Sequence, residues 1–305
     1  MTDKQRKGLD YLARADEFLY KIDYKDLLID LNSYIQSVPI SGITRDKIFR
    51  FDETHPRDYS VIYRARENEQ VPFKKIDCIS IIPDSKKEKI KFGRCNKELE
   101  EIFYASNDLR AACIEALTNG FTHGVQGNRM VTVGHWKIVE PLELAQINYS
   151  AKELNYFLQH DKERYEKMID YARGVEENTL KQIVQNSKGD PDFAKEFLEI
   201  ISAEFAKTKI EGAYDYFLSN YYCYHVFDNT VIENNQFIDG ILYPSVSFAY
   251  QEFNLALHPR AMKKLKFLYA TKVWIIYSAQ KDEFDFHTVE SNVKADSEGN
   301  LLWKQ

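Results

Sequence analysis

The feature that most constrains the fold is a helical block that separates two strand-rich stretches of the chain. Residues 150–225 contain four segments whose apolar residues recur at helical spacing, with Gly or Pro between the segments. These segments are Ala151–Tyr171, Glu176–Gln185, Asp192–Lys207 and Glu211–Tyr224. Short apolar runs typical of strands precede the block and return after Asn235. We therefore expect an α+β (mixed α/β) chain whose strands pair in one body, with a helical insertion over residues 150–225.

Three parts are expected along the chain. Residues 1–46 form an N-terminal helical extension, a hairpin broken near Asp23; residues 47–281 form the strand-rich body with its insertion; residues 282–305 form a charged, loosely attached tail. A short helix is expected over Leu109–Asn119, capped by Ser106 or Asn107. The expected strands are Ile48–Phe51, Val61–Arg64, Glu101–Ala105, Met130–Val139, Phe237–Tyr243, Phe248–Phe253 and Lys272–Ser278.

Composition narrows the class of protein. With 305 residues, 44% of them hydrophobic, the chain can bury a large core. The net charge of −6 argues against attraction of nucleic acid by the overall charge of the chain, so no direct nucleic-acid binding is expected. The sequence contains no transmembrane stretch and no apolar signal core, which predicts a cytoplasmic protein that does not bind membranes.

Cysteine and glycine patterns give no cofactor signal. The four Cys residues form no CxxC pair and lie at no zinc spacing, so we expect free thiols and no metal. The sequence has no GxGxxG, P-loop, HExxH or GxSxG motif. Gly120–Asn128 is interpreted as a helix-to-strand connection rather than a phosphate loop, and His135 as a structural histidine within a strand.

Glu115 is unusual because it lies in a short helix made mainly of small and apolar residues. Its helical face is shared with Ala111, Ala112 and Thr118, which leave room for another group to approach. A carboxylate in such a place needs a partner, because an unpaired buried charge is costly. A surface Glu on an amphipathic helix is the alternative.

Two arginines are candidates for anion binding. Arg64 follows Tyr63 at the end of an expected strand, and Arg94 follows Gly93. A guanidinium binds phosphate through a two-pronged fork, but most arginines are solvated or structural, and that alternative stays open. Ser245, after Pro244, is either a site residue or a simple strand-end residue.

Taken together, these segments resemble the RES domain family, named for an Arg, a Glu and a Ser. The family pattern is a YR strand, a GR-x-N turn, a strand with Tyr, a small-residue helix with Glu, and a late strand ending in YPS. The matching residues, in the same order, are Tyr63-Arg64, Gly93-Arg94 with Asn96, Tyr104, Glu115, and Gly240 with Tyr243-Pro244-Ser245. The resemblance covers residues 47–150 and 235–275.

The resemblance implies a fold like that of ADP-ribosyltransferases and an activity on NAD. It implies that Glu115 stabilises the oxocarbenium-like state reached when the nicotinamide–ribose bond breaks, and that Arg64 and Arg94 hold the pyrophosphate. Tyr104 would line the nicotinamide or ribose, and Ser245 would bind the ribose or position Glu115. Many RES proteins are toxins, so an Xre-like helix-turn-helix antitoxin is an implied partner.

Three functions remain open after the resemblance. The chain is either an NAD glycohydrolase or phosphorylase, a protein ADP-ribosyltransferase, or a non-catalytic RES-like interaction protein. Transferases commonly carry a second Glu two positions before the catalytic one, and here that position is Cys113, which favours a small acceptor. For the interaction protein, the aromatic segment Tyr214–Phe227 would be the binding surface, although helical spacing of this kind is more often core.

Overall fold

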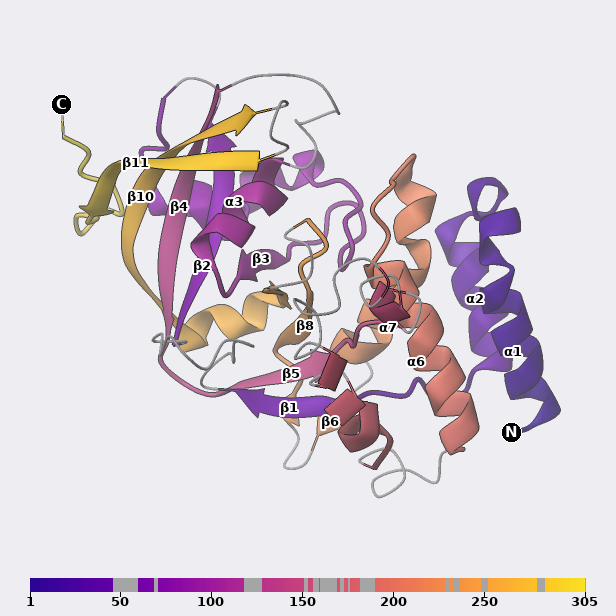
Figure 1. Cartoon of the computed structure of the whole chain (residues 1–305). Helices are drawn as coiled ribbons and strands as arrows, with labels where there is room; N and C mark the ends of the chain where they lie inside the picture. Colours follow the sequence, from indigo (N-terminus) through magenta and orange to yellow (C-terminus); the bar gives the residue numbers. More distant parts are fainter. Residues whose placement is uncertain are drawn as a thin grey trace. The chain divides into compact units, whose positions relative to one another are not determined.

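The structure is a computed structural model of the chain, shown in Figure 1. It describes residues 1–45, 60–68, 71–117, 128–150, 153–155, 159, 169–170, 173–174, 176–181, 190–228, 231–232, 236–247, 252–278 and 283–304. The expected strand Ile48–Phe51 and most of the glycine-containing segment Gly120–Asn128 lie outside these residues. The chain divides into two compact units, each built from separate stretches. The first unit comprises Met1–Thr44, Ile90–Glu100 and Glu143–Val246; the second comprises Arg45–Lys89, Glu101–Leu142 and Ser247–Gln305.

The elements confirm a mixed α+β chain. The helices are α1 (Asp3–Ala13), α2 (Tyr24–Tyr34), α3 (Leu109–Leu117), α6 (Pro191–Phe205) and α7 (Phe217–Asp228). The strands are β1 (Gly42–Arg45), β2 (Val61–Asn68), β3 (Phe103–Ser106), β4 (Asn128–Ile138), β5 (Leu142–Gln146), β6 (Val231–Ile232), β7 (Gln236–Phe237), β8 (Gly240–Pro244), β9 (Phe253–Leu257), β10 (Leu265–Ser278) and β11 (Glu283–Val293). Short 3-10 turns include η3 (Ile76–Ile79), η4 (Asp84–Lys89), η5 (Ala213–Tyr216) and η7 (Pro259–Lys264). None of the helices in the described ranges is long and apolar enough to cross a membrane.

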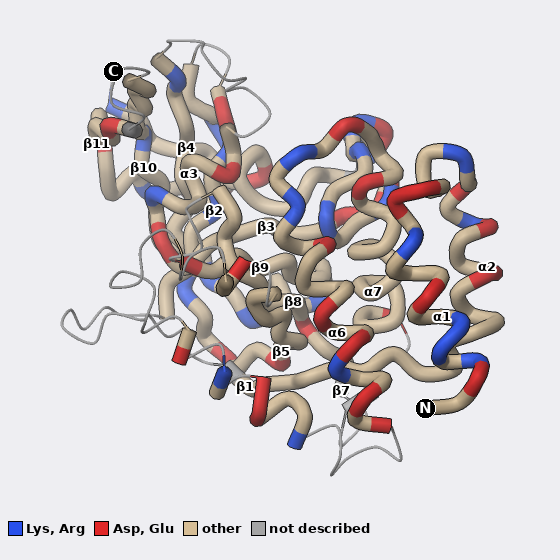
Figure 2. The backbone as a smooth tube through the Cα atoms, turned by 45° about the vertical axis from the view of Figure 1, so that its right-hand side comes forward, with Lys and Arg blue, Asp and Glu red and all other residues tan. Residues whose placement is uncertain are grey.

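The first unit contains the expected N-terminal hairpin. Asp23, where the periodicity breaks, caps α2 by accepting a hydrogen bond from the Lys25 amide. Residues of both charge signs occur on α1 and α2 (Figure 2), while Leu12 and Leu27 are buried. The hairpin therefore packs by one apolar stripe and leaves a charged stripe in water.

The helical block also belongs to the first unit. Helices α6 and α7 match the third and fourth expected helices, and the described residues of the first two, such as Glu176–Lys181, are helical. Nine of the residues in α7, including Tyr221 and Tyr222, are buried. The aromatic segment Tyr214–Phe227 is therefore largely core, as its spacing favoured. The sheet of this unit has the order β1-β5-β8, with β5 and β8 parallel.

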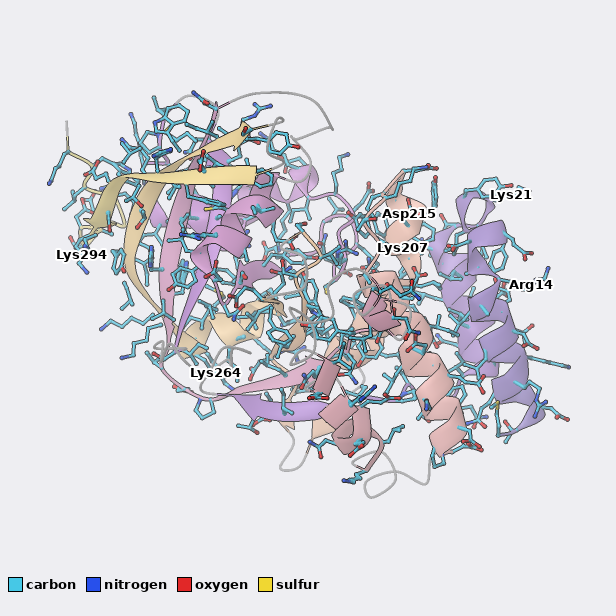
Figure 3. All side chains as sticks on the ribbon, viewed as in Figure 1. Arg14, Lys21, Lys207, Asp215, Lys264 and Lys294 are labelled. Atoms are coloured by element: carbon cyan, nitrogen blue, oxygen red, sulfur yellow. The ribbon has the colours of Figure 1, made fainter. Side chains whose placement is uncertain are left out.

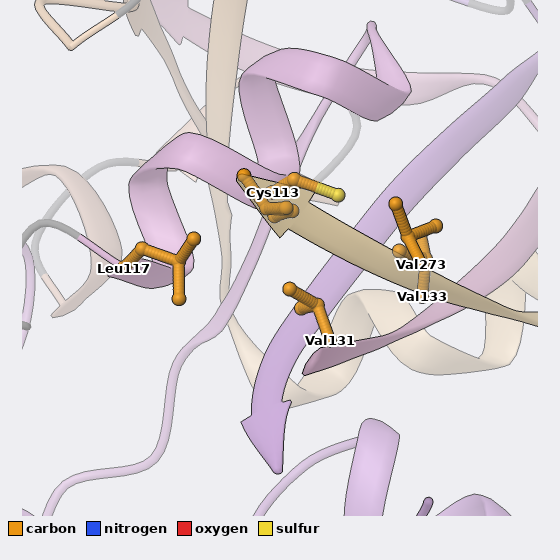
Figure 4. Close-up of a cluster of buried hydrophobic side chains, with 6 residues drawn as sticks. Cys113, Leu117, Val131, Val133 and Val273 are labelled. Atoms are coloured by element: carbon orange, nitrogen blue, oxygen red, sulfur yellow. The ribbon is translucent and has the colours of Figure 1, made fainter. Parts of the chain in front are cut away.

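The second unit is an antiparallel sheet with the order β9-β3-β2-β4-β10-β11. Helix α3 covers one face of it through Cys113 and Leu117, which pack on Val131, Val133 and Val273 (Figure 4). On another part of the sheet, Ile79 of η3 and Leu301 join Ala270 and Val293 in a second apolar cluster.

Two expectations for this unit are corrected. The segment expected as a loose tail contains β11, which pairs with β10 from Ser278 to Ala270. Its alternation of acidic and aromatic residues is that of an edge strand with one face in water. The helix cap is Asp108, whose Oδ1 accepts the amides of Arg110 and Ala111; Ser106 and Asn107 bond to Phe253 instead.

Candidate functional site

The five predicted site residues fall into two sets. Arg64, Tyr104 and Glu115 lie in the second unit, on β2, β3 and α3. Arg94 and Ser245 lie in the first unit, in the Gly93–Asn96 turn and directly after β8.

Arg64 is a deeply buried guanidinium, with 7% of its surface exposed. Its Nη1 donates to the main-chain oxygen of Tyr104 at 2.9 Å, and its Cζ lies 5.0 Å from the centre of the Phe103 ring. Burial, and secondarily the charge of Arg66, lowers the pKa of Arg64 to about 9. A cation desolvated in this way gains from any anion that reaches it.

The Arg64 side chain is incompletely paired. Its Nε has no hydrogen-bond partner, and no carboxylate is paired with it in the part of the chain that the structure describes. Arg66, two positions along β2, is held in a similar way, by the Cys78 carbonyl at 2.8 Å and the Phe73 ring at 5.4 Å. The unpaired Nε distinguishes Arg64, because no such orphan atom is found on Arg66. Buried polar atoms are nearly always hydrogen-bonded, so this one marks a candidate anion contact.

Glu115 projects from α3 and has a defined partner. Its Oε1 accepts a hydrogen bond of 2.8 Å from Nδ2 of Asn254 on β9, 139 positions later. The carboxylate that the sequence required to have a partner therefore has one. Asn254 was not among the predicted site residues, although a single polar residue inside the apolar run Phe253–Leu257 is a signal that points to it.

Strand register shows which of these side chains share a face. Tyr63 pairs with Ser106, and Ser106 pairs with Asn254, so the side chains of all three leave the sheet on the same side. Tyr63 packs against the cluster of α3, so this side is the face that α3 covers. Tyr104, two residues from Ser106, projects to the same face. Arg64, the neighbour of Tyr63, leaves β2 on the opposite face.

In the second unit, Glu115, Asn254 and Tyr104 thus lie on one face of the sheet, and the side chain of Arg64 leaves β2 on the opposite face. The guanidinium nevertheless reaches the Tyr104 carbonyl on β3, and Tyr104 contributes electrostatically by raising the pKa of Arg64. The β2–β3 register is the single pair Tyr63–Ser106, and the Arg64 contact lies beyond it. Arg64 therefore sits where the ladder between β2 and β3 stops.

Arg94 is anchored to the end of α6. Its Nη1 and Nη2 donate to the carbonyls of Glu204 and Lys207, at 3.4 and 2.5 Å. The last carbonyls of a helix lack partners within the helix, and a guanidinium satisfies them well. The turn that carries Arg94 is also held by α7, because Asn220 donates to the Gly93 carbonyl at 2.7 Å.

A charged cluster surrounds this helix end. Lys207, labelled in Figure 3, bonds to Glu204 at 2.8 Å and to Asp16 at 2.9 Å. Desolvation raises the pKa of Glu204 to about 7, against the lowering effect of Lys207. Ser245 is fully buried after Pro244, and the ring of Tyr243 packs on Phe205 of α6 at 5.3 Å.

The remaining residues considered as candidates, His135 and the four cysteines, lie in environments typical of structural residues. His135 bonds through Nε2 to Thr271 Oγ1 at 2.9 Å and stacks on Tyr269, and burial lowers its pKa to about 4. The four cysteines are free thiols, as expected. In the described ranges, no three His, Cys, Asp or Glu side chains are grouped so as to hold a metal ion.

No family model matches this chain, and neither the curated proteins nor the solved structures contain a match to it.

Proposed function

We propose that the protein consumes NAD by breaking the bond between nicotinamide and ribose, on an ADP-ribosyltransferase-like fold of the RES type. The observation that carries the proposal is Glu115: a carboxylate on a small-residue helix, fixed by the buried amide of Asn254. A fixed carboxylate stabilises the positive charge that develops on ribose when nicotinamide leaves.

The reaction needs few protein groups. The C1′–N bond breaks, and its electron pair leaves with nicotinamide, which departs neutral and needs no acid. Water or phosphate then forms the new bond to C1′, and the proton it loses passes to solvent or to a carboxylate. Tyr104, on the same face as Glu115, would line the ribose or the nicotinamide.

Arg64 is proposed to bind the pyrophosphate. Its buried charge has no carboxylate partner among the described residues, and Nε is an unused donor. Because its side chain starts from the face opposite Glu115, the dinucleotide would have to extend past the end of the β2–β3 ladder to touch both. Arg94 and Ser245 keep the roles that the resemblance implies, pyrophosphate binding and ribose positioning, as predictions.

A small acceptor is favoured over a protein acceptor. The position two residues before Glu115 is Cys113, which is fully buried in the cluster between α3 and the sheet. Burial raises the pKa of its thiol well above the ordinary value. Cys113 is therefore unsuited to activate a side chain of a target protein.

The test is incubation of the purified protein with NAD labelled in the adenylate part. We expect release of nicotinamide and accumulation of free ADP-ribose, or of its phosphate when phosphate is present. Label that accumulates on a protein band instead would make the chain an ADP-ribosyltransferase. No release of nicotinamide under any of these conditions would overturn the proposal and favour an interaction protein. Co-purification with an Xre-like helix-turn-helix protein would test the toxin role that the resemblance to RES proteins implies.

A further inference from the structure

Asn254 is the polar residue of an otherwise apolar buried strand, β9. It is 4% exposed, and its Nδ2 donates to Glu115 Oε1 at 2.8 Å. Its Oδ1 is buried and has no hydrogen-bond partner in the part of the chain that the structure describes. The side chain therefore uses one end of its amide on Glu115 and leaves the other end unpaired.

This arrangement is expensive for a residue that only stabilises the fold. A carboxylate accepts hydrogen bonds but cannot donate, so the NH2 end of the amide must face Glu115 and the oxygen must point elsewhere. Leaving a buried amide oxygen unpaired is costly, because the oxygen gives up the hydrogen bonds that it makes to water in the unfolded chain. A side chain kept at such a cost calls for an explanation other than packing.

Other buried asparagines of the same unit show the contrast. Asn68 donates to the Val71 carbonyl at 2.9 Å and accepts from Thr132 at 3.0 Å. Asn107 donates to Glu252 at 2.9 Å and accepts from the Phe253 amide at 2.7 Å. Both of these asparagines use the two ends of their amides.

The backbone that carries Asn254 is fixed next to the start of α3. Ser106 Oγ donates to the Phe253 carbonyl at 2.8 Å, and Asn107 holds the amide of the same residue. Asp108 caps α3 one residue further. The strand that carries Asn254 and the helix that carries Glu115 therefore share one buried polar network, which sets the distance between the two side chains.

We infer that Asn254 is a positioning residue for Glu115, retained to hold that carboxylate in one orientation. This inference rests on the proposed function. A Glu side chain has three rotatable bonds, and a carboxylate displaced by about 1 Å from the reacting ribose loses about a hundredfold in rate. The amide removes that freedom without adding a charge.

The experiment compares variants by nicotinamide release, pH–rate profile and thermal unfolding. Asn254→Ala should lower kcat about a hundredfold and leave KM within about twofold, because it loosens the carboxylate without removing a substrate contact. Asn254→Asp should also move the acid limb of the pH–rate profile to higher pH, because two adjacent carboxylates resist ionising together. Asn68→Ala, the matched control, should lose at least as much stability and keep the wild-type profile.

The outcomes separate this inference from the proposed function. If the wild-type protein releases nicotinamide and folded Asn254→Ala keeps its kcat, the inference fails alone. A raised KM with unchanged kcat makes Asn254 a substrate contact and also overturns it, as does an Asn254→Asp profile that stays in place. If the wild-type protein releases no nicotinamide, the proposed function fails and the role of Asn254 fails with it.

Discussion

The guanidinium of Arg64 donates to the main-chain oxygen of Tyr104 at 2.9 Å, joining β2 to β3 beyond their single register pair. The contact joins Arg64, which is proposed to bind the pyrophosphate, to β3, the strand whose Tyr104 is proposed to line the ribose or the nicotinamide. The alternative is that Arg64 has a purely structural role and only holds β2 and β3 together. The two roles predict different effects on NAD affinity and on stability when the charge of Arg64 is removed.

Arg64→Met should lower the affinity for NAD without lowering the stability of the fold. Replacing a buried charge that lacks a carboxylate partner by an apolar side chain of similar length is often neutral or stabilising. Loss of a charge-assisted contact to phosphate should raise KM about tenfold to a hundredfold. The checks are thermal unfolding and KM for NAD. Arg66→Met, on the same face of β2, is the control and should leave KM unchanged. If Arg64→Met is less stable than the wild type and keeps the wild-type KM, the role of Arg64 is structural.

Glu115→Gln should abolish most of the turnover and leave the protein folded. The amide keeps the shape but loses the charge that acts in the transition state, which costs at least about 3 kcal/mol, or more than a hundredfold in rate. Nicotinamide release and a circular dichroism spectrum check this. Glu67→Gln, which removes a surface partner of Arg129, is the control. Wild-type turnover in folded Glu115→Gln would move the catalytic role to another residue.

Arg94→Ala should loosen the end of α6. The guanidinium satisfies two carbonyls at that end, and charge-assisted hydrogen bonds of this kind contribute about 1–3 kcal/mol. Hydrogen exchange should therefore speed up at the amides that follow Ile201, and the free energy of unfolding should fall by a similar amount. Lys195→Ala, on an exposed turn of the same helix, should change neither. Unchanged exchange in Arg94→Ala would show that these contacts do not persist in solution.

Glu204 should make stability fall as the pH rises from about 4.5 to about 7. Desolvation raises the folded-state pKa to about 7 from the usual 4.5, so the folded protein binds more protons than the unfolded chain in this window. The stabilising contribution is complete below the lower value and is lost above the higher one. Denaturant titrations of Glu204→Gln across this range should lack that decline; a parallel curve for wild type and variant would contradict the assignment.

His135 should produce the opposite slope. Burial lowers its folded-state pKa to about 4 from 6.5, so between these values the unfolded chain binds more protons. Its contribution is complete above pH 6.5 and is lost as the pH falls toward 4. Because Glu204 contributes a decline over nearly the same window, the test is the difference between the two proteins: relative to the wild type, the unfolding free energy of His135→Gln should fall as the pH rises from about 4 to 6.5, as followed by the same titrations. A variant curve that runs parallel to that of the wild type would contradict the assignment.

Local patterns could be predicted from the sequence, and long-range pairings could not. The break at Asp23 and the strand after Asn128 follow from spacing and caps that neighbouring residues determine. The cap of α3 was assigned wrongly because Ser106, Asn107 and Asp108 all suit a cap. Contacts with Glu252 and Phe253, about 145 positions away, occupy the first two.

The same reason limits what the sequence could show of the site. The small-residue helix made Glu115 a candidate, but its partner Asn254 lies 139 positions away. The sequence does not distinguish Arg64 from Arg94. Only their burial and partners show that Arg64 is an incompletely paired guanidinium and that Arg94 binds the carbonyls at the end of α6. The β11 edge strand was missed because its acidic residues resemble those of a solvated tail.

The interleaving of the two units affects how the chain can be made and divided. Neither unit is a continuous stretch, so no single cut releases one as a ready-made fragment. On the ribosome, the strand that carries Glu115's partner and the two long strands of the same sheet, β10 and β11, emerge after residue 252. The Glu115 carboxylate is therefore made 139 residues before Asn254, its hydrogen-bond partner. If the finished protein destroys NAD, a chain that terminates before residue 254 would carry Glu115 without the amide that holds its carboxylate in place.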